Sequence, residues 1–254
     1  MKYSDLNFDS IKKLTKKEFV LVPVGCMEVH GPNLPFGSDI YIAEAFAYLI
    51  GEKTKSIIMP SVYYGHANAT KSIFGTISMD FDILAAYLCN IMDNLISSGF
   101  EKIIIINIHK DNDLAIKTAL TKIFEETGIP VLYINPYNDF SKFNDLVFGN
   151  KDNSYKETSL ILASLEILNK KEIVGEIRFP EHKYNKPSSL KNLLDIGYIR
   201  YEYINEMEHI NPEKDASAEE GKKYMDMAVD KITHKIDCLE EYINFLKNRG
   251  KNGF

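Results

Sequence analysis

Short apolar runs alternate with longer amphipathic segments along most of this chain. Four runs have the length and composition of buried strands, and they occupy residues 19–25, 56–60, 102–107 and 129–135. The run KIIIIN at 102–107 is β-branched and apolar on both faces. Such a run is typical of a strand in a sheet that is covered on both sides.

Helical periodicity fills the segments between these runs. Within residues 81–98 one stripe is formed by Leu84, Leu88, Ile91 and Leu95. Further helices are expected at 39–51, 113–127 and 157–169, and a long helical tail, broken or bent at one point, at 217–248. Asp39 is a candidate N-cap of the first of these helices, and Gly51 is a candidate residue just beyond its end.

The alternation of strands and helices with short connections indicates an α/β fold, with a mostly parallel sheet flanked by helices on both faces. Residues 179–212 contain three prolines and no regular pattern, so they are expected to form loops or an excursion near a site. Neither an internal repeat nor a linker divides the chain. The sequence therefore predicts a single domain over residues 1–254.

Charge and cysteine content narrow the class of protein. A net charge of −6 argues against a nucleic-acid partner and against docking to an anionic membrane. The three cysteines are widely spaced and suggest no disulfide framework. The first residues lack an apolar signal core, and every apolar run is too short to span a bilayer. We therefore expect a cytoplasmic protein without nucleic-acid or membrane partners.

Metal-ligand side chains follow two of the predicted strands. Glu28 and His30 follow the first strand with Asp39 further on, and His109 and Asp111 follow the isoleucine-rich strand. Ligands gather at the carboxyl ends of strands in open α/β sheets, so one edge receives all of these side chains. Either pair alone is more simply explained by caps and surface hydrogen bonds. Both pairs together favour a site for Zn, Mn or Fe, with enough ligands for two ions.

The segment PVGCMEVHGPNLPFGSD at residues 23–39 resembles the signature of the creatininase (creatinine amidohydrolase) family. The fragments GTIS at 75–78, SSGFEKIIIINIHKDN at 97–112 and ETS at 157–159 follow in the family's order, with a weaker match, DASAEEG, at 215–221. The resemblance spans most of residues 19–235.

The resemblance implies an α/β fold, a site for two divalent metal ions and hydrolysis of amide bonds in small molecules. It also implies a homo-oligomer, since the family commonly forms hexamers. The implied metal ligands are Glu28, His30, Asp39, His109 and Glu157, with Asp39 as the bridge. Asp111 is a further candidate ligand, at a position where creatininase itself has a glutamate and many relatives have a glycine.

The chain departs from the family pattern around the acid–base groups. Thr70 stands where a histidine is common, and Asp152 replaces the histidine thought to transfer protons. Asp152 and Asp111 are therefore the candidate catalytic residues for proton transfer. The metal ligands are kept better than the acid–base groups. This pattern predicts a retained metal site with a different substrate and disfavours creatinine itself.

The leading hypothesis is a metal-dependent amidohydrolase that cleaves a C–N bond, other than a peptide bond, in a small linear or cyclic amide. The attacking group would be a hydroxide activated between two metal ions. One alternative is a weakly active or non-catalytic metal-binding protein that keeps the fold, and another is a peptidase that trims a modified peptide. Cys26, beside the ligand loop, is interpreted as a small buried packing residue.

Overall fold

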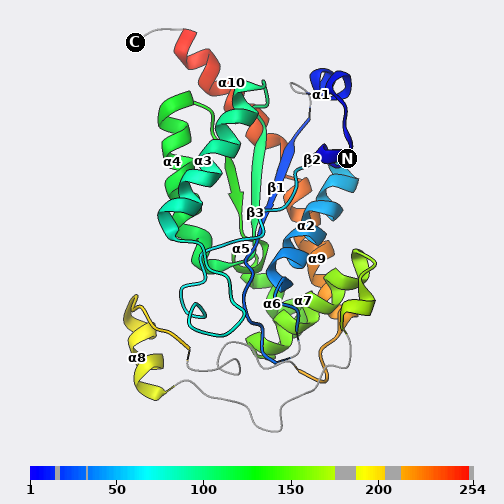
Figure 1. The fold of residues 1–254 in the computed structure, drawn as a ribbon. Helices are drawn as coiled ribbons and strands as arrows, with labels where there is room; N and C mark the ends of the chain where they lie inside the picture. Colours follow the sequence, from blue (N-terminus) through cyan, green and yellow to red (C-terminus); the bar gives the residue numbers. More distant parts are fainter. Residues whose placement is uncertain (15–17, 33, 175–186, 204–212, 252–254) are drawn as a thin grey trace.

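The computed structural model describes residues 1–14, 18–32, 34–174, 187–203 and 213–251. Its centre is a parallel sheet with the strand order β2-β1-β3-β4 (Figure 1). The strands are β1 (Val20–Val24), β2 (Ile57–Ile58), β3 (Ile103–Asn107) and β4 (Leu132–Ile134). All of them lie inside the apolar runs that predict strands, and their parallel pairing is confirmed.

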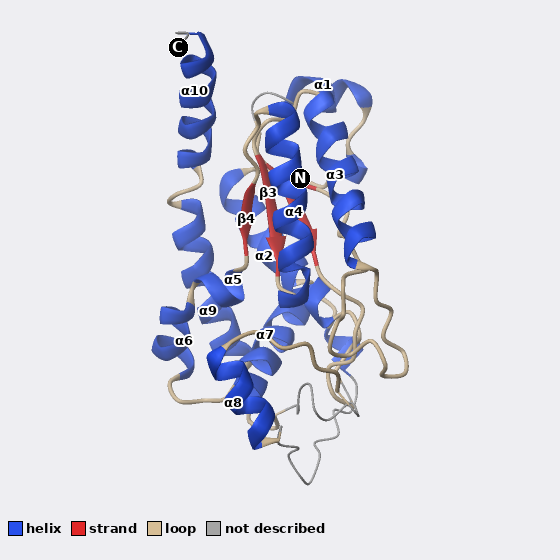
Figure 2. Ribbon diagram, turned by 90° about the vertical axis from the view of Figure 1, so that its left-hand side faces the viewer, coloured by secondary structure: helices blue, strands red, loops and turns tan. Residues whose placement is uncertain are grey.

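Helices cover both faces of this sheet, as Figures 1 and 2 show. One face packs against α2 (Ser38–Thr54), α7 (Asn153–Ile167) and α9 (Ala218–Thr233), and the other against α3 (Phe81–Ser97) and α4 (Asp113–Thr127). Successive residues of the central strands alternate between the two cores: Ile104 joins the first core and Ile105 the second. The predicted fold class is therefore confirmed.

The boundaries of α2 differ from the prediction at both ends. The helix begins at Ser38 with Gly37 as its N-cap residue, so Asp39 lies in the first turn and is not the cap. The helix continues beyond Gly51 and ends where Lys55 adopts a left-handed conformation (φ 61°). Gly51 is instead a packing residue, because a Cβ there would lie 2.9 Å from Cδ1 of Ile58 on β2.

Shorter elements complete the chain. They are η1 (Tyr3–Asp5), α1 (Phe8–Leu14), η2 (Lys110–Asn112), α5 (Pro136–Asp139), α6 (Ser141–Phe148), η3 (Lys171–Val174), α8 (Ser188–Ile196) and α10 (Asp237–Lys251). The break predicted in the C-terminal tail is confirmed, since α9 ends at Thr233 and α10 starts at Asp237. No helix in the described ranges is long and apolar enough to cross a membrane.

The loop prediction for residues 179–212 is wrong where α8 forms. Pro187 precedes this helix as its N-cap residue, and proline is tolerated at a helix start. None of the α8 side chains is buried, and the helix stands away from the sheet in Figure 1. Residues 179–186 and 204–212 lie outside the described residues.

We expect Gly221→Ala to destabilise the fold. A Cβ at Gly221 on α9 would lie 2.2 Å from the carbonyl oxygen of Ser159 and 2.8 Å from Cβ of Ala163, both on α7. This overlap outweighs the gain in helix propensity, and we expect a net loss of about 1–3 kcal/mol in urea unfolding. Gly197→Ala is the control, because nothing lies within 4 Å of its Cβ position. Equal stability of the two variants would contradict this packing.

Candidate metal centre

The carboxyl ends of β1 and β3 bring the candidate ligands to one edge of the sheet. The two strands pair directly, with Val24 opposite Asn107 at their ends, at the lower end of the sheet in Figure 1. The chain then turns tightly past the first turn of α2, because a Cβ on Gly25 would lie 2.7 Å from the backbone nitrogen of Ile40. The absence of a side chain at Gly25 therefore lets the loop after β1 meet the start of α2.

Backbone carbonyls orient the two imidazoles. Nδ1 of His30 donates to the carbonyl oxygen of Glu28 over 3.0 Å, and Nε2 of His109 donates to the carbonyl oxygen of His66 over 3.1 Å. These bonds fix the orientation of both rings and direct Nε2 of His30 and Nδ1 of His109 toward carboxylates. This is the arrangement of metal-ligating histidines, whose other ring nitrogen donates to an outer partner.

Asp39 lies between the two rings. Its Oδ1 is 3.4 Å from Nε2 of His30, and its Oδ2 is 3.0 Å from Nδ1 of His109. Glu157 Oε1 lies 3.3 Å from the same nitrogen of His30, and Glu28 Oε1 lies 2.9 Å from that of His109. The structure thus brings together all five ligands that the family resemblance implies, and their role as ligands stays a prediction.

Buried charges define the electrostatics of this cluster. Burial alone would raise the pKa of Asp39, but the imidazoles of His30 and His109 hold it well below its usual value. Burial alone would lower the pKa of both histidines, but the carboxylates raise it well above 6.5: chiefly Asp39 for His30 and Glu28 for His109. Without a metal ion, the two imidazoles are therefore held in their protonated form.

The donor set fits divalent metal ions. Glu28, His30 and Asp39 each offer one ligand atom, and these atoms lie within 4.8 Å of one another. All three side chains are buried, and three carboxylates surround two imidazoles. Zn and Mn both accept such nitrogen and oxygen ligands. These donors lie on both sides of Asp39, with His30 and Glu157 on one side and His109 and Glu28 on the other.

A cavity of about 320 Å³ opens onto this cluster. Besides the candidate ligands, residues that no sequence pattern predicts at the site line the cavity: Thr70, Tyr137, Asn153, Tyr201 and Tyr203. Thr70, at the position of the family's histidine, donates a hydrogen bond to Oε2 of Glu28. Tyr203 is held by a 2.7 Å bond from its N–H to the carbonyl oxygen of Ala69. Tyr201 and Tyr203 are brought to the cavity by long-range contacts of this kind. No local sequence pattern therefore identifies them as cavity residues.

The two candidate proton-transfer residues differ in position. Asp111 lines the cavity, and its Oδ2 accepts a 3.0 Å hydrogen bond from the N–H of Asn68. In the described part of the chain, the ion pairs of the cluster do not include Asp111. Asp152 is exposed and caps α7, with Oδ1 accepting a 2.9 Å bond from the N–H of Tyr155. The catalytic role of both residues stays a prediction.

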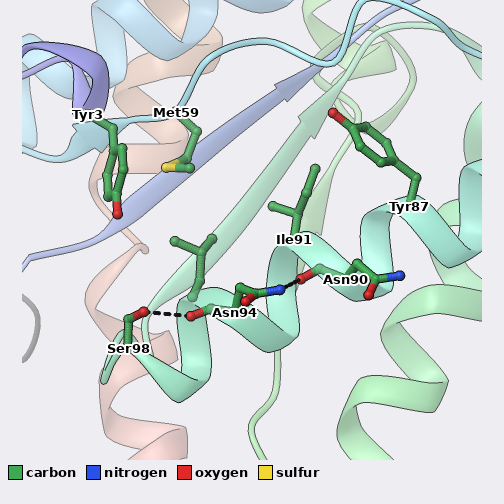
Figure 3. Close-up of a pocket in the computed structure, with 8 residues that line it drawn as sticks. Tyr3, Met59, Tyr87, Asn90, Ile91, Asn94 and Ser98 are labelled. Atoms are coloured by element: carbon green, nitrogen blue, oxygen red, sulfur yellow. Dashed lines mark hydrogen bonds between the residues drawn. The ribbon is translucent and has the colours of Figure 1, made fainter.

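A second cavity has a lining that differs in chemistry from the cavity at the carboxylate–imidazole cluster. It lies between the N-terminal segment and α3, has a volume of about 330 Å³, and is drawn in Figure 3. Its lining is Tyr3, Met59, Tyr87, Asn90, Ile91, Asn94, Leu95 and Ser98. These residues offer no carboxylate, imidazole or thiol, so this cavity lacks the chemistry of the centre.

The fold and the cluster together define an α/β protein with a carboxylate–imidazole centre at the carboxyl edge of its sheet. A family model described as creatininase (creatinine amidohydrolase) matches residues 4–236. The chain therefore belongs to the creatininase family.

Curated relatives match parts of the chain. The chain is 27% identical over 125 residues to a 3-dehydro-scyllo-inosose hydrolase of Thermotoga maritima, covering 49% of this chain and 40% of that protein. It is 26% identical over 102 residues to a creatinine amidohydrolase of Pseudomonas putida, covering 38% and 39%. It is 32% identical over 107 residues to a mycofactocin precursor peptide peptidase of Mycolicibacterium smegmatis, covering 40% and 43%. Each match spans about two fifths of the relative's length.

Solved structures match almost the whole chain. A mutant creatininase complexed with creatine superposes with a TM-score of 0.76 at 18% identity, covering 93% of this chain and 97% of that one. A manganese form of creatininase gives a TM-score of 0.75 at 18% identity, with the same coverage. A further mutant creatininase is of a Zn-Zn type. At this identity the similarity shows the fold.

Proposed function

We propose that this protein is a metal-dependent hydrolase that cleaves a C–N bond, other than a peptide bond, in a small linear or cyclic amide. The observation that supports this most directly is the pair of backbone-anchored imidazoles that face three carboxylates. Family membership supports hydrolysis in general. The names of the relatives include an amidohydrolase, an inosose hydrolase and a peptide peptidase, so family membership alone does not identify the type of bond that is cleaved.

His30, Asp39 and Glu157 would hold one divalent ion, and Glu28, His109 and Asp39 would hold the other. When bound, these ions supply Lewis acidity, which lowers the pKa of a water molecule and polarises a carbonyl group. Asp39 balances the charge of both positions because each of its oxygens faces a different imidazole. The backbone bonds to the two rings keep their ligand nitrogens directed at the site.

The cavity walls would bind and orient the substrate. Burial raises the pKa of Tyr137 and Tyr203. The charge of Glu157 raises that of Tyr137 further, and the hydrogen bond with Tyr201 raises that of Tyr203, so both hydroxyls stay protonated and can donate hydrogen bonds. A volume of about 320 Å³ lies at the small end of ligand pockets, which favours a small molecule. Asp111 lines this cavity and in this proposal would deliver a proton to the leaving nitrogen.

Metal analysis and a substrate panel test this proposal together. We expect protein purified without chelator to retain Zn, Mn or Fe, and to hydrolyse at least one compound among lactams, hydantoins and formamides when Zn or Mn is added. Chelator should abolish turnover, and added metal should restore it. Retained metal without turnover of any panel member would favour the non-catalytic alternative. Protein that neither retains nor rebinds metal would reject the proposal.

A peptidase is the second candidate, supported by the 32% identity to the mycofactocin precursor peptide peptidase. Short peptides with modified C-termini therefore belong in the same panel. Cleavage of these peptides without cleavage of the small amides would replace the amidohydrolase proposal with this one.

A further inference from the structure

Cys26 lies at the same two-residue spacing as the predicted metal ligands Glu28 and His30. Cys26, Glu28 and His30 are spaced two residues apart in the segment after β1, and such residues point to one side when the chain is extended. The backbone of Met27, between them, pairs with Ile77 through a β-bridge, which is consistent with an extended segment. Cys26 is fully buried, as are Glu28 and His30. The thiol therefore lies on the ligand side of this segment.

The surroundings of the thiol are those of a metal ligand. The sulfur of Cys26, a carboxylate oxygen of Glu28 and a ring nitrogen of His109 all lie within 4.8 Å of one another, and all three residues are buried. Beside this group, Oδ2 of Asp39 is buried and lies 3.0 Å from Nδ1 of His109, but the geometry makes no hydrogen bond to it within the part of the chain that is described. A cation among these groups would satisfy this oxygen.

Cys89 shows what a packing cysteine looks like in the same fold. It is buried on α3, and its thiol donates to the carbonyl oxygen of Ala119 over 3.7 Å, among apolar neighbours. The sulfur of Cys26 instead lies beside a carboxylate oxygen of Glu28 and a ring nitrogen of His109. Packing alone therefore does not account for the thiol at Cys26.

We propose that Cys26 supplies a thiolate ligand to the metal ion held by Glu28 and His109. The inference rests on the metal site of the proposed function and extends it. On binding, the sulfur–metal bond forms and the thiol proton is released to solvent. A thiolate is a soft ligand, so this position would prefer Zn, Co or Cd to Mn, whereas the position at His30, Asp39 and Glu157 offers only nitrogen and oxygen.

Cobalt substitution of the whole chain tests this directly. Co²⁺ added to metal-free protein should produce a sulfur-to-cobalt charge-transfer band in the near ultraviolet, in addition to the visible bands of any bound Co²⁺. X-ray absorption of the Zn form should show a sulfur neighbour at about 2.3 Å. Cys26→Ala should lose both signals and weaken Zn binding by about 10–100-fold, the scale of losing one supporting group. Cys89→Ala is the matched control and should keep both signals.

The outcomes separate this inference from the proposed function. Visible Co²⁺ bands without the charge-transfer band in the wild-type protein would overturn the thiolate ligand and leave the metal site intact. Absence of all Co²⁺ bands, with no Zn bound, would overturn both. If Cys26→Ala fails to fold, as judged by circular dichroism, the X-ray absorption of the wild-type Zn form decides alone.

Discussion

Asp39→Asn is expected to abolish tight metal binding and turnover while leaving the protein folded. The substitution keeps the size of the side chain but removes the charge that faces both imidazoles. It also places an amide N–H₂ where one carboxylate oxygen faces a ring nitrogen. Because Asp39 serves both metal positions, we expect Zn affinity to fall by more than the ~100-fold that is typical of losing an outer-shell partner. Equilibrium dialysis with Zn measures this loss.

Asp93→Asn is the matched control, because it makes the same chemical change at an exposed position on α3. It should leave Zn affinity and turnover at wild-type values. Circular dichroism of both variants checks that they are folded. Wild-type Zn affinity in Asp39→Asn would show that the carboxylate is not a ligand, and the binuclear proposal would then fail.

The fold was largely predictable from local patterns. β3 was clear because four consecutive isoleucines, Ile103 to Ile106, are buried between two layers of helices. α4 has the predicted bounds, since Gly128 adopts the left-handed conformation that ends a helix (φ 69°). The predicted ends of α2 were wrong at both termini. Asp39 faces the two imidazoles and Gly51 packs against Ile58, and these tertiary contacts explain residues that look like a helix cap and a helix end in the sequence.

Only the site residues that follow the ends of strands were predictable from local patterns in the sequence. His30 and His109 follow strands that pair directly, so the parallel sheet brings them together. Tyr201 and Tyr203 come from a segment without a hydrophobic pattern, and the bond from Tyr203 to Ala69 places this segment at the cavity. This contact joins residues more than 130 positions apart, and nothing in the local sequence specifies it.

Zinc affinity is expected to rise steeply with pH. In the metal-free protein the pKa of His30 and of His109 is raised well above 6.5 by the surrounding carboxylates. The stability that these imidazolium groups contribute is fully present below pH 6.5 and is lost as the pH rises through their raised pKa values. The lowered pKa of Asp39 has the opposite effect. The stability that its carboxylate contributes is present at a pH above the usual pKa of an aspartate and is lost as the pH falls through the lowered pKa.

Each metal ion requires its own imidazole to be neutral, so filling both positions must displace one proton from each ring below the raised pKa values. Counting the imidazole protons alone, the apparent affinity for each Zn ion should therefore rise by about one order of magnitude per pH unit in this range, and the combined affinity for the two ions by about two orders, or about 2.7 kcal/mol. Thermal unfolding with excess Zn and without metal, from about pH 5.5 to 7.5, measures the effect as a Zn-induced stabilisation that grows with pH. His234→Gln, which removes an exposed histidine at the end of α9, should leave the slope unchanged. A Zn affinity that is independent of pH would mean that the buried imidazoles carry no proton before the metal binds, and the charge arrangement assigned to the cluster would be wrong.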